Sequence, residues 1–137
     1  MTVPHVYQAI HAISAHMAAE GLAKTQSNQQ QGYKFRGIDQ VMNALAPLLV
    51  KHHLVIIPRY LSRSRGERQT KSGGALFYTT LRAEFDFVSV IDGSKHTAAA
   101  YGEGMDSADK SCNKAAACAY KYAAFQTFCI PTEGDGD

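Results

Sequence analysis

Residues 77–87 read FYTTLRAEFDF, and this stretch carries the strictest periodicity in the chain. Apolar side chains recur on one side of it, at Phe77, Leu81, Ala83, Phe85 and Phe87. The side chains that point the other way are Tyr78, Thr80, Arg82, Glu84 and Asp86. A period of two predicts a β-strand, and one apolar face with one polar face predicts an antiparallel sheet that is covered on one side only.

The segments on either side predict two more strands of the same sheet. Residues 54–61 (LVIIPRYL) form the first strand, and residues 63–74 are polar, basic and glycine-containing. We therefore expect residues 63–74 to form a long, mobile hairpin tip. The Asp92-Gly93 pair predicts a turn into a third strand, Lys95 to Tyr101.

Helical spacing before and after these strands completes the fold. A first helix is predicted around Val6, Ile10, Ile13 and Met17 and ends near Gly21. Asp39 can cap a second helix, with an apolar face of Met42, Leu45 and Leu49, which Pro47 should kink or restart.

An alanine-rich helix from Ser107 to about Phe128 follows the strands. The class is therefore α+β: an antiparallel three-stranded β-meander followed by a long helix (a β-β-β-α core), with two preceding helices. We expect one domain over residues 1–132 and an acidic end over residues 133–137.

Composition narrows the class of protein. The 137 residues suffice for one core, 45% of them are apolar, and the net charge is +2. Most of the 14 Lys and Arg lie between Lys51 and Lys110, which favours a polyanionic partner. Three cysteines without a CxxC pair indicate reduced thiols. We find no signal-peptide pattern and no membrane-length apolar run, and therefore expect a cytoplasmic protein.

The segment from Gly102 to Ser111 resembles an incomplete phosphate-binding loop. Gly104 and Lys110-Ser111 fit the pattern of Gly, four residues and Gly-Lys-Ser, but Asp109 replaces the second glycine. A carboxylate there would repel a phosphate from the helix N-terminus. The segment therefore argues against nucleotide binding, and its aspartates, Asp106 and Asp109, are expected to cap the final helix.

Basic residues recur at positions suited to a phosphate backbone. Lys110, Lys114 and Lys121 fall within roughly 40° of one another on a helix of ~100° per residue. Residues 33–36 alternate aromatic and basic side chains, a combination that binds single-stranded nucleic acid. The candidate DNA-binding residues are Tyr33, Lys34, Phe35, Arg36, Arg59, Arg63, Arg82, Lys110, Lys114 and Lys121. The alternative is that the lysines form a solvated face and that the rings anchor their loop.

Catalytic interpretations find less support in the sequence. His52-His53 offers one metal ligand without a second cluster at a suitable spacing, and no nucleophile elbow is present. We predict no enzyme activity, no catalytic residue, no metal and no cofactor.

Two stretches resemble the Erf (essential recombination function) family of phage single-strand annealing proteins. The first is YKFRG at residues 33–37 with residues 39–41 and 45–49. The second begins at Gly102–Asp106 and continues through residues 109–110, 114–115, 120–122 and 128–132. Together they extend over most of the chain.

The resemblance implies a curved β-β-β-α unit that assembles into rings or helical filaments. Such assemblies hold single-stranded DNA in a basic groove and anneal complementary strands without ATP. On this resemblance Lys110, Lys114 and Lys121 contact phosphates, and Lys34 and Arg36 lie on the groove wall. The expected partners are single-stranded DNA, further copies of the chain, and a host single-strand-binding protein or phage exonuclease, all in the host bacterial cytoplasm.

Three alternatives stay open at this point. A single-stranded DNA coating protein would use the same residues and impede pairing. A nucleotide-binding enzyme would use residues 104–111. An interaction scaffold would have no affinity for nucleic acid.

Overall fold

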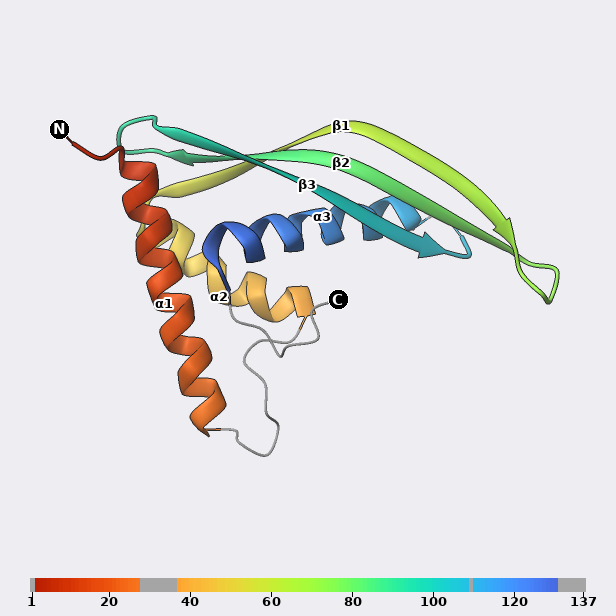
Figure 1. The fold of residues 1–137 in the computed structure, drawn as a ribbon, viewed down its shortest axis with the longest axis horizontal. Helices are drawn as coiled ribbons and strands as arrows, with labels where there is room; N and C mark the ends of the chain where they lie inside the picture. The colour runs from red at the N-terminus through yellow and green to blue at the C-terminus, as the bar shows by residue number, and fades with distance from the viewer. Residues whose placement is uncertain (1, 28–36, 109, 131–137) are drawn as a thin grey trace. The chain divides into compact units, whose positions relative to one another are not determined.

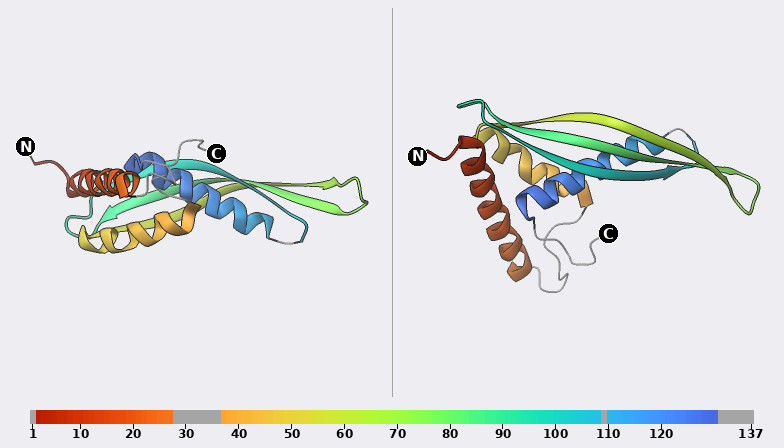
Figure 2. Two further views of the ribbon diagram at one scale, coloured as in Figure 1. Left: turned by 90° about the horizontal axis from the view of Figure 1, so that it is seen from below. Right: turned by 45° about the horizontal axis from the view of Figure 1, so that its top comes forward.

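The computed structural model describes residues 2–27, 37–108 and 110–130. The elements of these ranges are, in order, α1 (His5–Ser27), α2 (Gly37–Lys51), β1 (Leu54–Gln69), β2 (Ala75–Ser89), β3 (Lys95–Asp106) and α3 (Ser111–Phe128). The strands form one sheet in the order β1-β2-β3 and lie side by side in each view (Figures 1 and 2). The predicted class is confirmed: an antiparallel meander followed by a long helix, with two helices before it.

The chain divides into two compact units. The first comprises Met1–Ile56, Phe87–His96 and Ala124–Asp137, and the second comprises Ile57–Asp86 and Thr97–Ala123. The expected domain boundary at residue 132 stays a prediction.

The core of the second unit lies between β2 and α3. Leu81, Ala83 and Phe85 of β2 are buried, as their alternation predicts. The Phe85 ring packs against Tyr120 of α3 with 5.7 Å between ring centroids. Burial of these apolar groups is the main stabilising contribution here.

Two glycines of β3 allow α3 to approach the sheet closely. A Cβ on Gly102 would come closer than 3.0 Å to backbone atoms of Ala115 and Ala119, and a Cβ on Gly104 would meet Ser111 and Ala115 in the same way. The third strand was expected to end at Tyr101 and the final helix to begin at Ser107. Both limits differ in the structure, because β3 continues through the two glycines to Asp106 and α3 begins only at Ser111.

The hairpin between β1 and β2 is much more ordered than expected. β1 extends to Gln69 and β2 begins at Ala75, so residues 63–69 are strand rather than mobile tip. The turn is short: the amide of Thr70 donates to the carbonyl of Gly74 (2.8 Å), and the Thr70 hydroxyl accepts from the Gly74 amide (3.0 Å). Polar composition misled the prediction, because an edge strand can expose polar side chains on both faces.

The side-chain alternation of β1 slips by one residue along its length. Arg59 pairs with Glu84 and Asp86 on the polar face of β2. Arg65 is six residues after Arg59, so regular alternation would place it on the same polar face. Its guanidinium instead lies over the ring of Phe77, which is on the same face of β2 as the buried Leu81. We infer one extra residue between Arg59 and Arg65, as at a β-bulge.

In the first unit, the turn between β2 and β3 supplies hydrogen bonds to the start of α1. The amide of His5 donates to the Asp92 carboxylate (2.9 Å), and the amide of Val6 donates to the Ser94 hydroxyl (2.9 Å). These side chains satisfy amides that a helix N-terminus leaves unpaired. The predicted Asp92-Gly93 turn is thereby confirmed. α1 itself continues past the expected end at Gly21 to Ser27.

The buried face of α2 differs by one position from the prediction. Val41, Leu45 and Leu48 are buried, whereas Met42 is exposed. The helix runs through Pro47 to Lys51 and does not restart there. Burial of Leu45 and Leu48 around the proline offsets the hydrogen bond that proline cannot donate.

Candidate nucleic-acid interface

The predicted lysine stripe is only partly on α3. Lys114 and Lys121 are helical and seven residues apart, so they share a face of α3. Lys110 precedes the helix, and its carbonyl accepts the first helical hydrogen bond, from the amide of Lys114 (3.0 Å). The ammonium of Lys121 lies 5.5 Å from the ring centroid of Tyr122.

Lys114 is engaged by a carboxylate of the same unit. Its Nζ donates to Oδ1 of Asp106 (2.9 Å) and to the carbonyl of Met105 (3.0 Å). The bond from Lys114, followed by those from the amides of Ala108 and Lys110, lowers the pKa of Asp106 to about 2. A DNA phosphate would therefore have to compete with Asp106 for this lysine.

The same carboxylate occupies the position that an anion would need. Oδ2 of Asp106 accepts from the amides of Ala108 (3.0 Å) and Lys110 (3.3 Å), just before α3 begins. Backbone amides at such a place bind phosphate in nucleotide-binding loops. Asp106 was expected to cap the first turn of the helix. It instead binds the loop amides before Ser111, and Asp109 lies outside the described residues.

Arg59 is held in a network that crosses all three strands. Its guanidinium donates to both oxygens of Asp86 (2.5 and 3.2 Å) and to Glu84 (2.9 Å). Thr97 of β3 also donates to Asp86 (2.7 Å). The hydrogen bonds that Arg59 donates to Asp86, and then to Glu84, raise the pKa of Arg59. This arrangement suits a structural clamp better than a phosphate contact.

The remaining candidates lie at different places in the second unit. Arg82 is exposed on the face of β2 away from α3, which we call the open face. Arg63 lines a groove of about 620 Å³ between β1 and α3, together with Tyr60, Cys112 and Asn113. Tyr33, Lys34, Phe35 and Arg36 lie outside the described residues. The candidate DNA-binding residues that the structure describes therefore do not lie in a single groove of one protomer.

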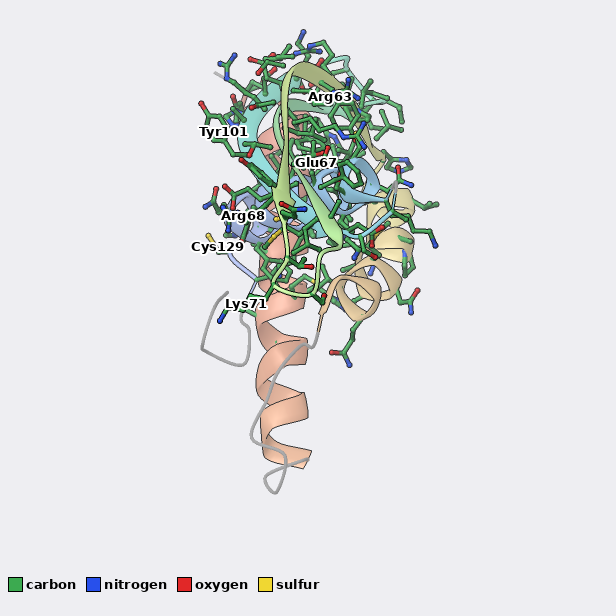
Figure 3. The ribbon with its side chains drawn as sticks, turned by 90° about the vertical axis from the view of Figure 1, so that its right-hand side faces the viewer. Arg63, Glu67, Arg68, Lys71, Tyr101 and Cys129 are labelled. Carbon is green, nitrogen blue, oxygen red and sulfur yellow. The ribbon has the colours of Figure 1, made fainter. Side chains whose placement is uncertain are left out.

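Sequence reasoning undervalued the far half of β1 and its turn, which were assigned to a mobile tip. Four cations follow one another there, and we call them the basic arm: Arg63, Arg65, Arg68 and Lys71. Figure 3 looks onto this end, where Arg63, Arg68 and Lys71 are labelled with Glu67. The Arg68 guanidinium lies 5.5 Å from the ring centroid of Tyr78. The sequence did indicate one half of this contact, because the alternation of β2 places Tyr78 on the open face.

Two further functions find no support in the described ranges. No group of three or more His, Cys, Asp or Glu residues is placed there to hold a metal ion. No helix among these residues is long and apolar enough to cross a bilayer.

The structure is that of an α+β protein built on a β-β-β-α unit, with the basic arm on its edge strand and turn. The chain belongs to the ERF superfamily, whose family model matches residues 6–137. This is a family of phage single-strand annealing proteins that act in DNA recombination. No curated protein and no solved structure gives a significant match to the chain.

Proposed function

We propose that this protein binds single-stranded DNA and anneals complementary strands without ATP, as a homo-oligomeric ring or helical filament. Family membership supplies the general setting of recombination by strand annealing. The finer assignment is supported by the basic arm, by the loop before α3 and by the exposed edge of β1.

The basic arm is the observation that carries the proposal. Within the described ranges, no ion pair joins Arg63, Arg65, Arg68 or Lys71 to a carboxylate. Arg65 and Arg68 lie instead over the rings of Phe77 and Tyr78. Cations beside solvent-accessible rings can displace counterions from a phosphate backbone while bases contact the aromatic groups.

Independence from ATP is supported by Asp106. Its carboxylate already accepts hydrogen bonds from the two backbone amides that a nucleotide phosphate would use, and it pairs with Lys114. The free energy for annealing then comes from base pairing itself. The protein contributes by holding two strands close together, which raises their effective concentration.

Assembly is supported by the edge strand β1. Its apolar side chains Val55, Ile57, Tyr60 and Leu61 are each more than two-fifths exposed. An apolar edge strand is a template for another strand. A second copy of the chain would cover it, and repetition of this head-to-tail contact produces a ring or a filament.

In this proposal the protein acts in the host bacterial cytoplasm. A host single-strand-binding protein or a phage exonuclease would be further partners. Both follow from the role in recombination rather than from any contact described above.

A fluorescence assay with two complementary oligonucleotides tests the proposal. The protein should accelerate pairing above the protein-free rate, with or without ATP. Arg63→Glu should reduce this acceleration at least several-fold, because it reverses a charge in the basic arm. Lys95→Glu makes the same charge change at an exposed position of the first unit, and it should leave the acceleration intact.

Each alternative gives a different result in the same experiment. Inhibition of pairing despite DNA binding would identify a coating protein and overturn the annealing proposal. Acceleration that requires ATP would identify a nucleotide-dependent enzyme. Absence of DNA binding at low salt would leave an interaction scaffold.

A further inference from the structure

A shallow pocket of about 450 Å³ lies on the open face of the second unit, near the hairpin turn. All three strands contribute to its lining. The side chains that matter here are Arg68 from β1, Tyr78 and Thr80 from β2, and Glu103 and Met105 from β3. We call this the open-face pocket. None of its lining residues is among the DNA contacts predicted from the sequence, and Arg68 belongs to the basic arm.

The ring of Tyr78 is held in place by the neighbouring strand. A Cβ on Gly66 would lie closer than 3.0 Å to three atoms of the Tyr78 phenol, so the ring rests directly on the glycine backbone. Such packing of an aromatic ring over an edge-strand glycine fixes the ring. Tyr78 nevertheless stays 38% exposed. The pocket therefore offers an aromatic ring that is already ordered, so a ligand does not lose affinity by immobilising it.

The charge of the pocket argues against a phosphate as its occupant. Arg68 contributes one positive charge and Glu103 one negative charge, so they cancel. Met105 is 57% exposed and adds a polarisable thioether that packs well against flat rings. A ligand that fits is flat and uncharged, with N–H donors on one edge for the carboxylate.

We propose that the open-face pocket takes one nucleobase of a bound single strand, and that guanine fits it best. The proposal rests on the single-stranded DNA binding proposed above. The base stacks on Tyr78 and Met105, and its edge faces Glu103. An ionised carboxylate only accepts hydrogen bonds, and guanine presents two adjacent donors, N1–H and N2–H, to its two oxygens. Thymine presents a single N–H. The two donors of guanine also belong to the edge that pairs with cytosine, so the base leaves the pocket when the complementary strand pairs with it.

Two labelled oligonucleotides with the same backbone test the base contact by fluorescence anisotropy. One carries isolated guanines in a thymine strand, and the other carries abasic sites in place of the guanines. The wild-type protein should bind the guanine strand about tenfold more tightly, as loss of one stacked base predicts. Tyr78→Ala should bind both strands equally, at the affinity of the wild type for the abasic strand. Tyr101→Ala is the matched control, because Tyr101 is an exposed ring of β3 outside the pocket.

A second variant avoids any loss of packing over Gly66. Glu103 is exposed, so Glu103→Gln should leave the fold intact. The wild type should prefer guanine over inosine several-fold, because inosine lacks only the N2 amino group. Glu103→Gln should lose that preference while retaining the preference for guanine over an abasic site.

The outcomes separate this proposal from the one on which it rests. Equal wild-type affinity for the guanine and abasic strands would overturn the open-face pocket as a base site and leave backbone binding and annealing standing. Absence of binding to either strand would overturn both. Free dGMP should compete only weakly, since it lacks the backbone contacts. Micromolar competition by dGMP would reassign the pocket to a mononucleotide.

Discussion

The Nζ of Lys114 lies 2.9 Å from Oδ1 of Asp106, so the first lysine within α3 is paired with a carboxylate eight residues before it. Both side chains remain accessible to solvent, with 52% of Lys114 and 17% of Asp106 exposed. The pair can therefore exchange partners without disturbing a buried group. Its lysine is available to DNA only in competition with Asp106.

Removal of the Asp106 charge should strengthen DNA binding. Asp106→Asn keeps an oxygen for the loop amides but frees Lys114 for a phosphate. We expect single-stranded DNA affinity to rise by up to about fivefold, the range of an exposed ion pair. Anisotropy titrations at low salt measure this. In a protein that already carries Lys114→Gln, Asp106→Asn should raise DNA affinity only by the small effect of removing one negative charge. A rise in affinity as large as in the wild-type background would contradict the pairing of Asp106 with Lys114.

Acid should remove the stabilisation that Asp106 provides. Its pKa is about 2 in the folded protein and near 3.9 in an unfolded chain. A depressed carboxyl pKa gives stability that is complete above the unfolded value and is lost as pH falls toward the folded one. The difference in free energy of unfolding between wild type and Asp106→Asn should thus shrink between about pH 4 and pH 2. Urea denaturation across this window gives that difference, and a pH-independent value would show that the carboxylate is not held as described.

Substitution of Gly102 should separate α3 from the sheet. Gly102→Ala places a methyl group against the backbone of Ala115 and Ala119, which cannot move aside as a flexible side chain can. We expect a loss of about 1–3 kcal/mol in the free energy of unfolding, the usual cost of overpacking. Gly74→Ala is the control, since a Cβ there meets only the Thr70 hydroxyl at 3.4 Å. Similar stability of the two variants in chemical denaturation would rule out the close approach.

Substitution of Arg59 should affect stability more than DNA binding. Arg59→Ala leaves the largely buried Asp86 carboxylate without its bidentate partner and should lower the free energy of unfolding. A double-mutant cycle with Asp86→Asn should show strong coupling in the free energy of unfolding. Single-stranded DNA affinity of the folded variant should change less than it does in Arg63→Glu. If Arg59→Ala lowers the free energy of DNA binding by more than it lowers the free energy of unfolding, Arg59 is a DNA contact.

The basic arm should determine the salt dependence of DNA binding. Each phosphate contact to a single strand contributes about 0.7 to the slope of log K against log salt. Arg63→Gln with Lys71→Gln should therefore lower the slope by about 1.4, whatever the sequence of the oligonucleotide. Titrations at several salt concentrations give the slope. An unchanged slope would show that the arm does not contact the backbone.

The sequence predicts the meander well because burial imposes a period of two on β2. Leu81, Ala83 and Phe85 could be assigned to one face from the sequence alone. The extent of the neighbouring strands was less predictable. Residues 63–69 are polar because β1 is an edge strand with solvent on both faces, and composition does not distinguish that from a loop.

The candidate site was predicted less completely than the fold. Spacing along a helix placed Lys114 and Lys121 on one face. It contains no information on Asp106, the carboxylate at the end of β3 that pairs with Lys114. The clamp around Arg59 and the ring of Tyr78 over Gly66 depend on strand register. Register becomes known only when the strands are paired.

The loop before α3 behaves as a binding site that carries its own ligand. Asp106 is tethered within four residues of the amides that it binds, so it is present there at a high effective concentration at all times. A free nucleotide at millimolar concentration would compete against this tethered anion for the same two N–H groups. The segment thus has the spacing of a phosphate-binding loop, but these two N–H groups are already occupied by a carboxylate of the same chain.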